Sequence, residues 1–388
     1  MFRFAAAILV VFNISCAKNA DDSRKGIDPQ PEVAAPALIE DSLTVQPLSV
    51  PASALEDKAH LTIRKSSLEK EFLLQTSMIT VAGAPRFRGM KSRVIAFRWR
   101  GDKVYLVEAT KGHTVTKDLP QTLILAEFNI LNQAEETLTV DFNKGMSQLF
   151  VATDWRAQDL DGGAYGNEFV AVEARSSYIE EAKTVNNTVV LRQIAQLKLP
   201  NVGAQANLHL QAVEVKYYLS PYNPDQTYKP VRSKDFLRTG FFEGAPLANV
   251  DGADLVYATR FNPANPITYA VSANTPAEFK DAVREGVLYW NQAFGKEVVK
   301  AIDAPAGVVA PDSAYNVVQW IAYDAAGGAY ADAQIDPRSG EILHAQVWMS
   351  SAFGFLGKWR AHELYRRLKP QAPKAPTISL AGFQTEGM

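Results

Sequence analysis

Cysteine and histidine are scarce in this sequence, and their scarcity excludes several kinds of site. Cys16 is the only cysteine in 388 residues, so the chain cannot form an internal disulfide. No two histidines lie three to five residues apart, which is the spacing typical of paired zinc ligands on one helix. Neither H-E-x-x-H, H-x-x-E-H nor the G-x-S-x-G turn of serine hydrolases occurs. We therefore predict neither metal ligands nor catalytic residues in this chain. The histidines are His60, His113, His209, His344 and His362.

Basic and acidic residues are nearly equal in number, so neither sign of charge is in excess. Lys and Arg number 40 against 42 Asp and Glu, which gives a formal net charge of −2. A nucleic-acid-binding protein needs a basic face or stripe, so we expect no nucleic-acid partner. Six basic residues do fall close together on a strand-rich segment, and we interpret them as a solvated strand face rather than an anion site. They are Arg86, Arg88, Lys91, Arg93, Arg98 and Arg100.

One acidic, glycine-rich stretch offers oxygen ligands that could hold Ca²⁺. Its carboxylates belong to Asp154, Asp159, Asp161 and Glu168. Their spacing does not fit an EF-hand loop, in which a bidentate Glu closes the ligand set. A turn capped by Asx hydrogen bonds is therefore the favoured interpretation, and a Ca²⁺ site at 154–168 stays an open alternative.

The N-terminus carries an apolar run, FAAAILVVF at 4–12, that is too short to span a bilayer but has the length of a signal-peptide core. The following N-I-S-C resembles a bacterial lipoprotein signal, although Asn13 stands where Leu is usual. The resemblance implies cleavage before Cys16 and a diacylglycerol on its sulfur. It also implies a membrane-anchored lipoprotein of the cell envelope, on the outer membrane, its periplasmic face or the surface. An ordinary secretory signal with a chance cysteine is the alternative.

Composition and periodicity divide the rest of the chain into three parts. Residues 16–60 are rich in Pro, Ala, Asp and Glu and predict a flexible tether after a signal peptide at 1–15. Residues 61–245 alternate apolar and polar side chains between turns, which predicts an antiparallel β-rich domain. The strands expected there are 94–100, 103–108, 122–130, 136–142, 188–194, 206–212 and 213–219.

The pattern changes after residue 246, where strands and a helix follow one another. We predict strands at 267–271, 316–323 and 341–349, with a helix that Gly295 ends. Thr275 and Glu278 have the spacing of a capping box at the start of this helix. The predicted fold class is α+β, with the β-rich domain followed by an α/β unit at 246–388.

Four stretches of this second part resemble the start of a metzincin-type zinc peptidase domain. They read PITYAV at 266–271, YWNQAFG at 289–295, YNVVQWI at 315–321 and DPRSGEIL at 336–343. The likeness is to bacterial lipoproteins and secreted proteins in which an uncharacterised β domain precedes an EcxA-like zinc-binding peptidase domain. The residues that it marks as structural are Trp290, Asn291, Phe294, Asp336, Gly340 and Glu341.

The resemblance implies a twisted mixed sheet with packed helices and an edge strand that binds extended peptide substrate by main-chain pairing. It further implies that a complete family member holds Zn²⁺ on an H-E-x-x-H-x-x-G-x-x-H helix further along the chain. The candidate edge strand is Leu343, His344, Ala345, Gln346, Val347 and Trp348.

His362 and Glu363 begin a zinc-binding motif without completing it. Arg366 occupies the place of the second ligand, and a guanidinium has no lone pair to donate. We interpret AHELYRRL at 361–368 as an amphipathic linking helix in which Arg366 and Arg367 are solvated. We expect a metzincin-like subdomain truncated before the zinc site, without a cofactor of its own. A separate chain carrying the zinc-binding half would then be a possible partner.

Two functions follow from these observations. The first is a cell-envelope lipoprotein of the zinc metallopeptidase family, whose complete members hydrolyse peptide bonds, but which is inactive as this chain alone. The second is a non-enzymatic module that holds an extended peptide or a protein partner on the strand near 343–348. The membrane, through the lipid on Cys16, is the remaining partner that the sequence predicts.

Overall fold

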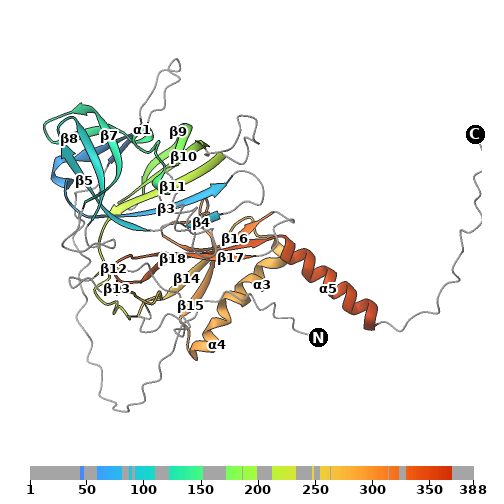
Figure 1. The fold of residues 1–388 in the computed structure, drawn as a ribbon. Coiled ribbons are helices and arrows are strands. Elements are labelled where there is room, and N and C mark those ends of the chain that lie inside the picture. Colours follow the sequence, from blue (N-terminus) through green and yellow to red (C-terminus); the bar gives the residue numbers. More distant parts are fainter. Residues whose placement is uncertain are drawn as a thin grey trace, which may run out of the picture.

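The computed structural model describes residues 44–47, 59–80, 87–89, 92–109, 122–151, 172–185, 187–198, 212–232, 247–248, 254–262, 264–312, 314–322 and 329–368. Cys16, the acidic stretch at 154–168 and the strand expected at 206–212 lie outside the described residues. Within them the fold is α+β, as predicted: a curled antiparallel sheet is followed by a smaller mixed sheet with helices (Figure 1).

The first sheet has eleven strands, and every pair in it is antiparallel. It curls until its first and last strands, β1 and β9, lie near each other. In spatial order the strands are β1 (Thr44–Pro47), β2 (Ala59–Arg64), β8 (Thr137–Asp141), β7 (Leu123–Gln133), β6 (Lys103–Glu108), β5 (Arg93–Arg100), β3 (Phe72–Thr80), β11 (Ala212–Pro221), β10 (Thr188–Lys198) and β9 (Glu173–Val185), with β4 (Phe87–Gly89) also beside β3. The expectation of a tether is wrong for 44–47, because β1 pairs with β2.

Alternation along the strands builds the core of this sheet. In β10 every second residue is buried, which separates a core face from an outer face. A line of aromatic rings crosses the core, with Phe128 stacked on Phe142 and the ring of Tyr217 edge-on to Phe142. The Tyr217 hydroxyl donates to Gln193 Oε1 at 2.7 Å, so its buried polar end is satisfied. Phe142 begins the short helix α1 (Phe142–Gly145), and a 3-10 turn, η1, spans Lys65–Ser67.

The second sheet has five strands in the order β15-β14-β16-β18-β17. Their bounds are β14 (Ile267–Val271), β15 (Val299–Asp303), β16 (Asn316–Ile321), β17 (Tyr330–Ile335) and β18 (Ile342–Ser350). Four run parallel, and β17 alone is antiparallel to its neighbour β18. A minor pair, β12 (Leu247–Ala248) with β13 (Asp254–Leu255), lies between the two sheets in the sequence.

A helix crosses from β14 to β15, as the parallel pairing requires. It is divided into α3 (Ala277–Leu288) and α4 (Trp290–Phe294), and Gly295 ends it with a left-handed φ of 63°. The expected capping box is wrong: Pro276 is the N-cap, and no side chain caps the helix. The Thr275 hydroxyl lies 3.0 Å from Ser272 Oγ instead.

The last helix, α5 (Ala352–Leu368), follows β18 directly and projects from the body in Figure 1. Its first turns pack on α3, because a Cβ on Gly354 would lie only 2.8 Å from the Phe279 ring. Phe279 is in turn stacked on Trp320, with 5.2 Å between ring centroids. The helix predicted at 361–368 is confirmed. The apolar side chains Trp359, Leu364 and Leu368 on this helix are all exposed. No described helix is both long enough and apolar enough to cross a membrane.

Candidate functional site

The strand proposed to bind peptide is not at the edge of its sheet. Residues 343–348 belong to β18, which pairs with β16 on one side and with β17 on the other. Its side chains are buried from Ala345 to Ser350. The expectation of an edge strand here is therefore wrong, since both rows of main-chain groups are already used by neighbours.

The outer strand at this end of the sheet is β17, residues 330–335. It pairs with β18 from Tyr330 opposite Trp348 to Ile335 opposite Ile342, with one irregularity near Gln334. Among the described strands none pairs with the other side of β17, although β4 of the first sheet lies close to it. Ala331 is exposed. The strand therefore presents an edge of main-chain groups beside the candidate residues.

Two buried glutamines mark the face of the sheet that is turned away from α3. Gln346 shares this face with Trp348, which packs on Val317 and Ala310, whereas Ala345 and Val347 join the cluster that holds α3. Gln334 lies opposite His344 in the register of β17 and β18. Both amide ends of Gln334 and of Gln346 are buried without a hydrogen-bond partner. An apolar sheet face would not need these groups, so the glutamines make the face beside β17 polar.

The resemblance marks three residues of the WNQAF stretch as structural, and two of them pack on the apolar cluster of the second sheet. Trp290 and Phe294 are partly buried against it. Asn291 joins the helix to the next strand: its Oδ1 accepts from the backbone N–H groups of Val298 and Val299 at 2.8 Å, and its Nδ2 donates to the Val299 carbonyl at 2.8 Å. These residues position β15 and have no contact that suggests chemistry.

The DPRSGE turn is built around Asp336. Its Oδ1 accepts the Arg338 N–H at 2.8 Å, and its carbonyl accepts the Gly340 N–H at 2.9 Å. Gly340 has a φ of 77°, and a Cβ there would lie 2.8 Å from the Ala258 carbonyl oxygen. The turn therefore needs glycine for both its conformation and its close approach to the neighbouring chain.

This turn also fastens the two sheets together. The Arg338 guanidinium donates to both carboxylate oxygens of Glu71, at 2.6 and 2.7 Å, across 267 residues of sequence. The Tyr222 hydroxyl donates to Asp336 at 3.0 Å, and Arg338 lies 4.8 Å from the centre of the Tyr222 ring. Glu71 and Tyr222 flank strands of the first sheet. Sequence reasoning missed both, because nothing local distinguishes them from other surface residues.

A third missed residue, Asp225, ties together parts of the chain between the two sheets. Its carboxylate accepts from the Thr227 hydroxyl and from the side-chain amides of Asn262 and Asn265, at 2.6 to 2.9 Å. These hydrogen bonds, that of the Thr227 hydroxyl foremost, lower the pKa of Asp225 to about 2. The carboxylate therefore stays charged at any ordinary pH.

Glu341 is a further buried acid near the contacts between the two sheets, and in the described part of the chain its carboxylate lacks hydrogen bonds of this kind. Among the described residues none donates a hydrogen bond to its carboxylate. Burial, together with the charges of Asp225 and Asp336, raises the pKa of Glu341 to about 7. These three acids do not converge, however: the described residues contain no group of three His, Cys, Asp or Glu side chains that could hold a metal ion.

The histidines do not form a site within the described residues either. His344 lies in β18, where burial lowers its pKa to about 4, so it is neutral at physiological pH. His362 lies on α5, where neighbouring Glu363 instead forms ion pairs with Arg366 at 3.5 Å and Arg367 at 3.3 Å. Both arginines are exposed, as predicted for a solvated helix face.

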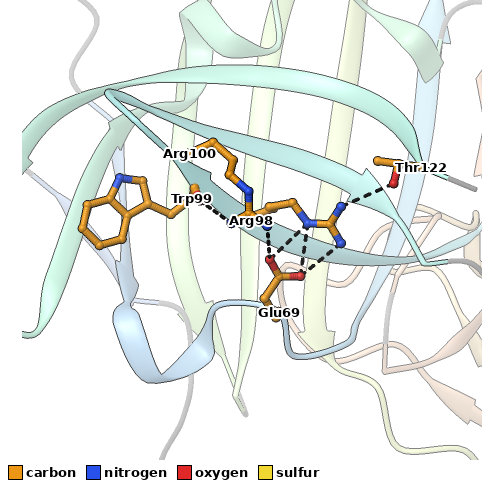
Figure 2. Close-up of polar contacts among 5 residues, drawn as sticks. All are labelled: Glu69, Arg98, Trp99, Arg100 and Thr122. Carbon is orange, nitrogen blue, oxygen red and sulfur yellow. Dashed lines mark hydrogen bonds and ion pairs between the residues drawn. The ribbon is translucent and has the colours of Figure 1, made fainter.

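The basic cluster of β5 is used by internal contacts. Figure 2 shows Arg98 and Glu69 joined by hydrogen bonds of 3.0 and 3.2 Å, with Arg100 3.8 Å from the same carboxylate and Thr122 completing the group. The expectation of a solvated face is wrong for Arg93, which is buried in an ion pair of 2.6 Å with Glu108. Arg86 and Lys91 lie outside the described residues.

We predict that the contact between Arg338 and Glu71 couples the two sheets energetically. In a double-mutant cycle of Arg338→Met and Glu71→Gln, the coupling energy should be about 1 kcal/mol, since the pair is bidentate but Glu71 is exposed. The exposed pair of Arg366 and Glu363 serves as control and should couple by less than about 0.5 kcal/mol. Equal coupling in the two cycles, measured by denaturant unfolding, would contradict this assignment.

We also predict that Glu341 makes stability depend on pH. Because its pKa is raised, the folded protein binds more protons than the unfolded chain between pH 4.5, the ordinary value, and about 7. Stability should therefore fall as pH rises through this window. Glu341→Gln should abolish that part of the decline, so that the variant unfolds at a higher temperature than the wild type above pH 7. An offset that stays constant from pH 4 to pH 8 would rule this out.

Comparison with known proteins adds no further assignment. No protein-family model, no curated protein and no solved structure matches the chain. The likeness to zinc peptidases therefore rests on the four stretches of sequence quoted above. The contacts around β17 and the DPRSGE turn are the observations from which a function is argued.

Proposed function

We propose that this protein is a cell-envelope lipoprotein related to the zinc metallopeptidases, and that it holds an extended peptide or protein segment without hydrolysing it. The observation that carries the binding role is the outer edge of β17. An antiparallel outer strand can take a further strand by the same kind of main-chain hydrogen bonds that join it to its sheet.

The polarity of β17 fits this role better than that of β18. The strand reads YADAQI and contains neither proline nor lysine, the residues that most often block pairing at an edge. The proposal thus keeps the binding mode implied by the family resemblance but moves it from 343–348 to 330–335.

The absence of hydrolysis is supported by the chemistry of the side chains present. The whole sequence contains no H-E-x-x-H motif, and Arg366 stands where its second histidine would be. Within the described residues no cluster of metal-ligating groups has formed by folding either. Among the described residues, peptide bound at β17 would therefore meet no cluster of metal ligands through which water could be activated.

The binding role predicts an asymmetric response to proline in β17. Successive residues of a strand direct their N–H groups to opposite sides. Of Ala331→Pro and Asp332→Pro, one therefore removes an outward N–H and the other breaks a bond to β18. Peptides captured by the wild type from an array of decapeptides should be recovered intact. The variant that keeps the wild-type melting temperature should bind them at least about tenfold more weakly.

The paired design supplies its own control, because the destabilised variant reports damage to the sheet. Full binding by the variant with unchanged stability would refute the assignment of the edge, as would an array without any captured peptide. Cleaved peptides whose production stops on addition of a chelator would refute the claim that the chain does not hydrolyse them.

The lipoprotein assignment is tested separately at Cys16. Expressed in a bacterial host, the wild type should incorporate labelled palmitate and sediment with the membranes. Cys16→Ser should lose the label and leave the membrane fraction, because it has no sulfur to acylate. Ser15→Ala is the control and should keep both properties. Labelling that persists in Cys16→Ser would show that the anchor lies elsewhere.

A further inference from the structure

A cleft of about 1040 Å³ lies between the two sheets, away from β17. One wall is the outer face of β9, β10 and β11, which carries Arg192, Lys216 and Tyr218. The other wall comes from the second domain and includes Val308, Tyr315 and Trp320. The volume is in the range of sites for small organic ligands.

The two walls are held together by a direct contact. The Tyr218 hydroxyl, which is buried, donates to the Pro311 carbonyl at 2.6 Å. Beyond this contact, Asp312 turns the chain, because its Oδ1 accepts the N–H groups of Ala314 and Tyr315 at 2.8 and 3.2 Å. The cleft is thus formed by ordered elements on both sides.

Two of the basic side chains of the cleft, Arg192 and Lys183, are paired with its glutamates. Arg192 lies 3.4 Å from Glu214 and 3.7 Å from Glu181, and Lys183 donates to Glu181 at 2.6 Å. Lys216 stands directly opposite Arg192 in the register of β10 and β11. In the part of the chain that the structure describes, Lys216 Nζ forms neither a hydrogen bond nor an ion pair.

The surroundings of Lys216 disfavour an ammonium group without a partner. Burial, with the positive charge of Arg192 added, lowers the pKa of Lys216 against the opposing effect of Glu214, Asp312 and Glu181. A cation in such a place is stabilised by an anion that accepts its hydrogen bonds. The remaining wall of valine, alanine and aromatic side chains suits an apolar body attached to that anion.

We propose that this cleft is a binding site for an organic carboxylate with an apolar or aromatic body, whose carboxylate pairs with Lys216. The body of the ligand lies against Tyr315, Val308 and Ile321, because the Trp320 ring is stacked on Phe279 on the other face of the sheet. Arg192 and Lys183 take no direct part, because their own carboxylate partners occupy them. The site is separate from the β17 edge, so either proposal can fail without the other.

The test compares 1-naphthoate with its neutral analogue 1-naphthamide, measured by calorimetric titration of the whole protein at pH 7. The wild type should bind the carboxylate at least about tenfold more tightly than the amide, because a charge-assisted bond is lost in the amide. Lys216→Met should bind both equally and weakly, whereas Lys216→Arg should retain the preference. Lys183→Met, a charge change at the rim of the same cleft, should behave as the wild type.

Three results would overturn the proposal: no binding of 1-naphthoate to the wild type, undiminished binding to Lys216→Met, or equal losses in Lys216→Met and Lys183→Met. The last result would show a general effect of positive charge. Melting curves of each variant accompany the titrations, and Lys216→Arg decides the outcome if Lys216→Met unfolds.

Discussion

The bidentate contact between Arg338 and Glu71 is one of the polar contacts that hold the two sheets together, with the hydrogen bond from Tyr218 to the Pro311 carbonyl as another. It joins a turn of the second sheet to the start of β3 in the first, with Tyr222 packed on the same guanidinium. Arginine suits this place because its planar fork matches a carboxylate and its face lies on an aromatic ring. The cleft beside Lys216 and the nearness of β4 to β17 both require the sheets to be held in this relation.

The junction is polar rather than apolar, and this shapes what it can do. Hydrogen bonds lower the pKa of Asp225 to about 2, whereas burial raises that of Glu341 to about 7. Glu341 instead remains close to its titration point at neutral pH. A junction of this kind adds less to stability than a packed apolar interface of the same size, because each buried polar group must be compensated. Specific geometry, rather than burial of apolar area, therefore defines how the sheets meet.

Much of the fold was predictable from the spacing of apolar residues and from turn and helix-end residues, whereas the candidate site was not. The strand at 267–271 and the glycine that ends its helix were predicted correctly, because alternation and chain termination are local signals. The capping box at Thr275 failed because its hydroxyl contacts Ser272, a tertiary choice that sequence spacing does not reveal. Strand β9 was missed because most of its residues are exposed or half-exposed, which weakens the alternation. Partners such as Glu71 lie hundreds of residues from the motif they serve.

The sequence of 343–348 already contained a signal against its prediction as an edge strand. β18 has a nearly continuous run of buried residues, ILHAQVWMS, which is typical of a strand with neighbours on both sides and covered faces. The shorter YADAQI is less apolar and pairs with a described strand on one side only. The pattern of apolar residues in a strand does not reveal the order of strands in the sheet, but it does indicate how much of the strand is buried. A strand that must hide both faces is a poor candidate for receiving a peptide, and the less apolar neighbour is the better one. For this reason the proposed binding role is assigned to 330–335 rather than to 343–348.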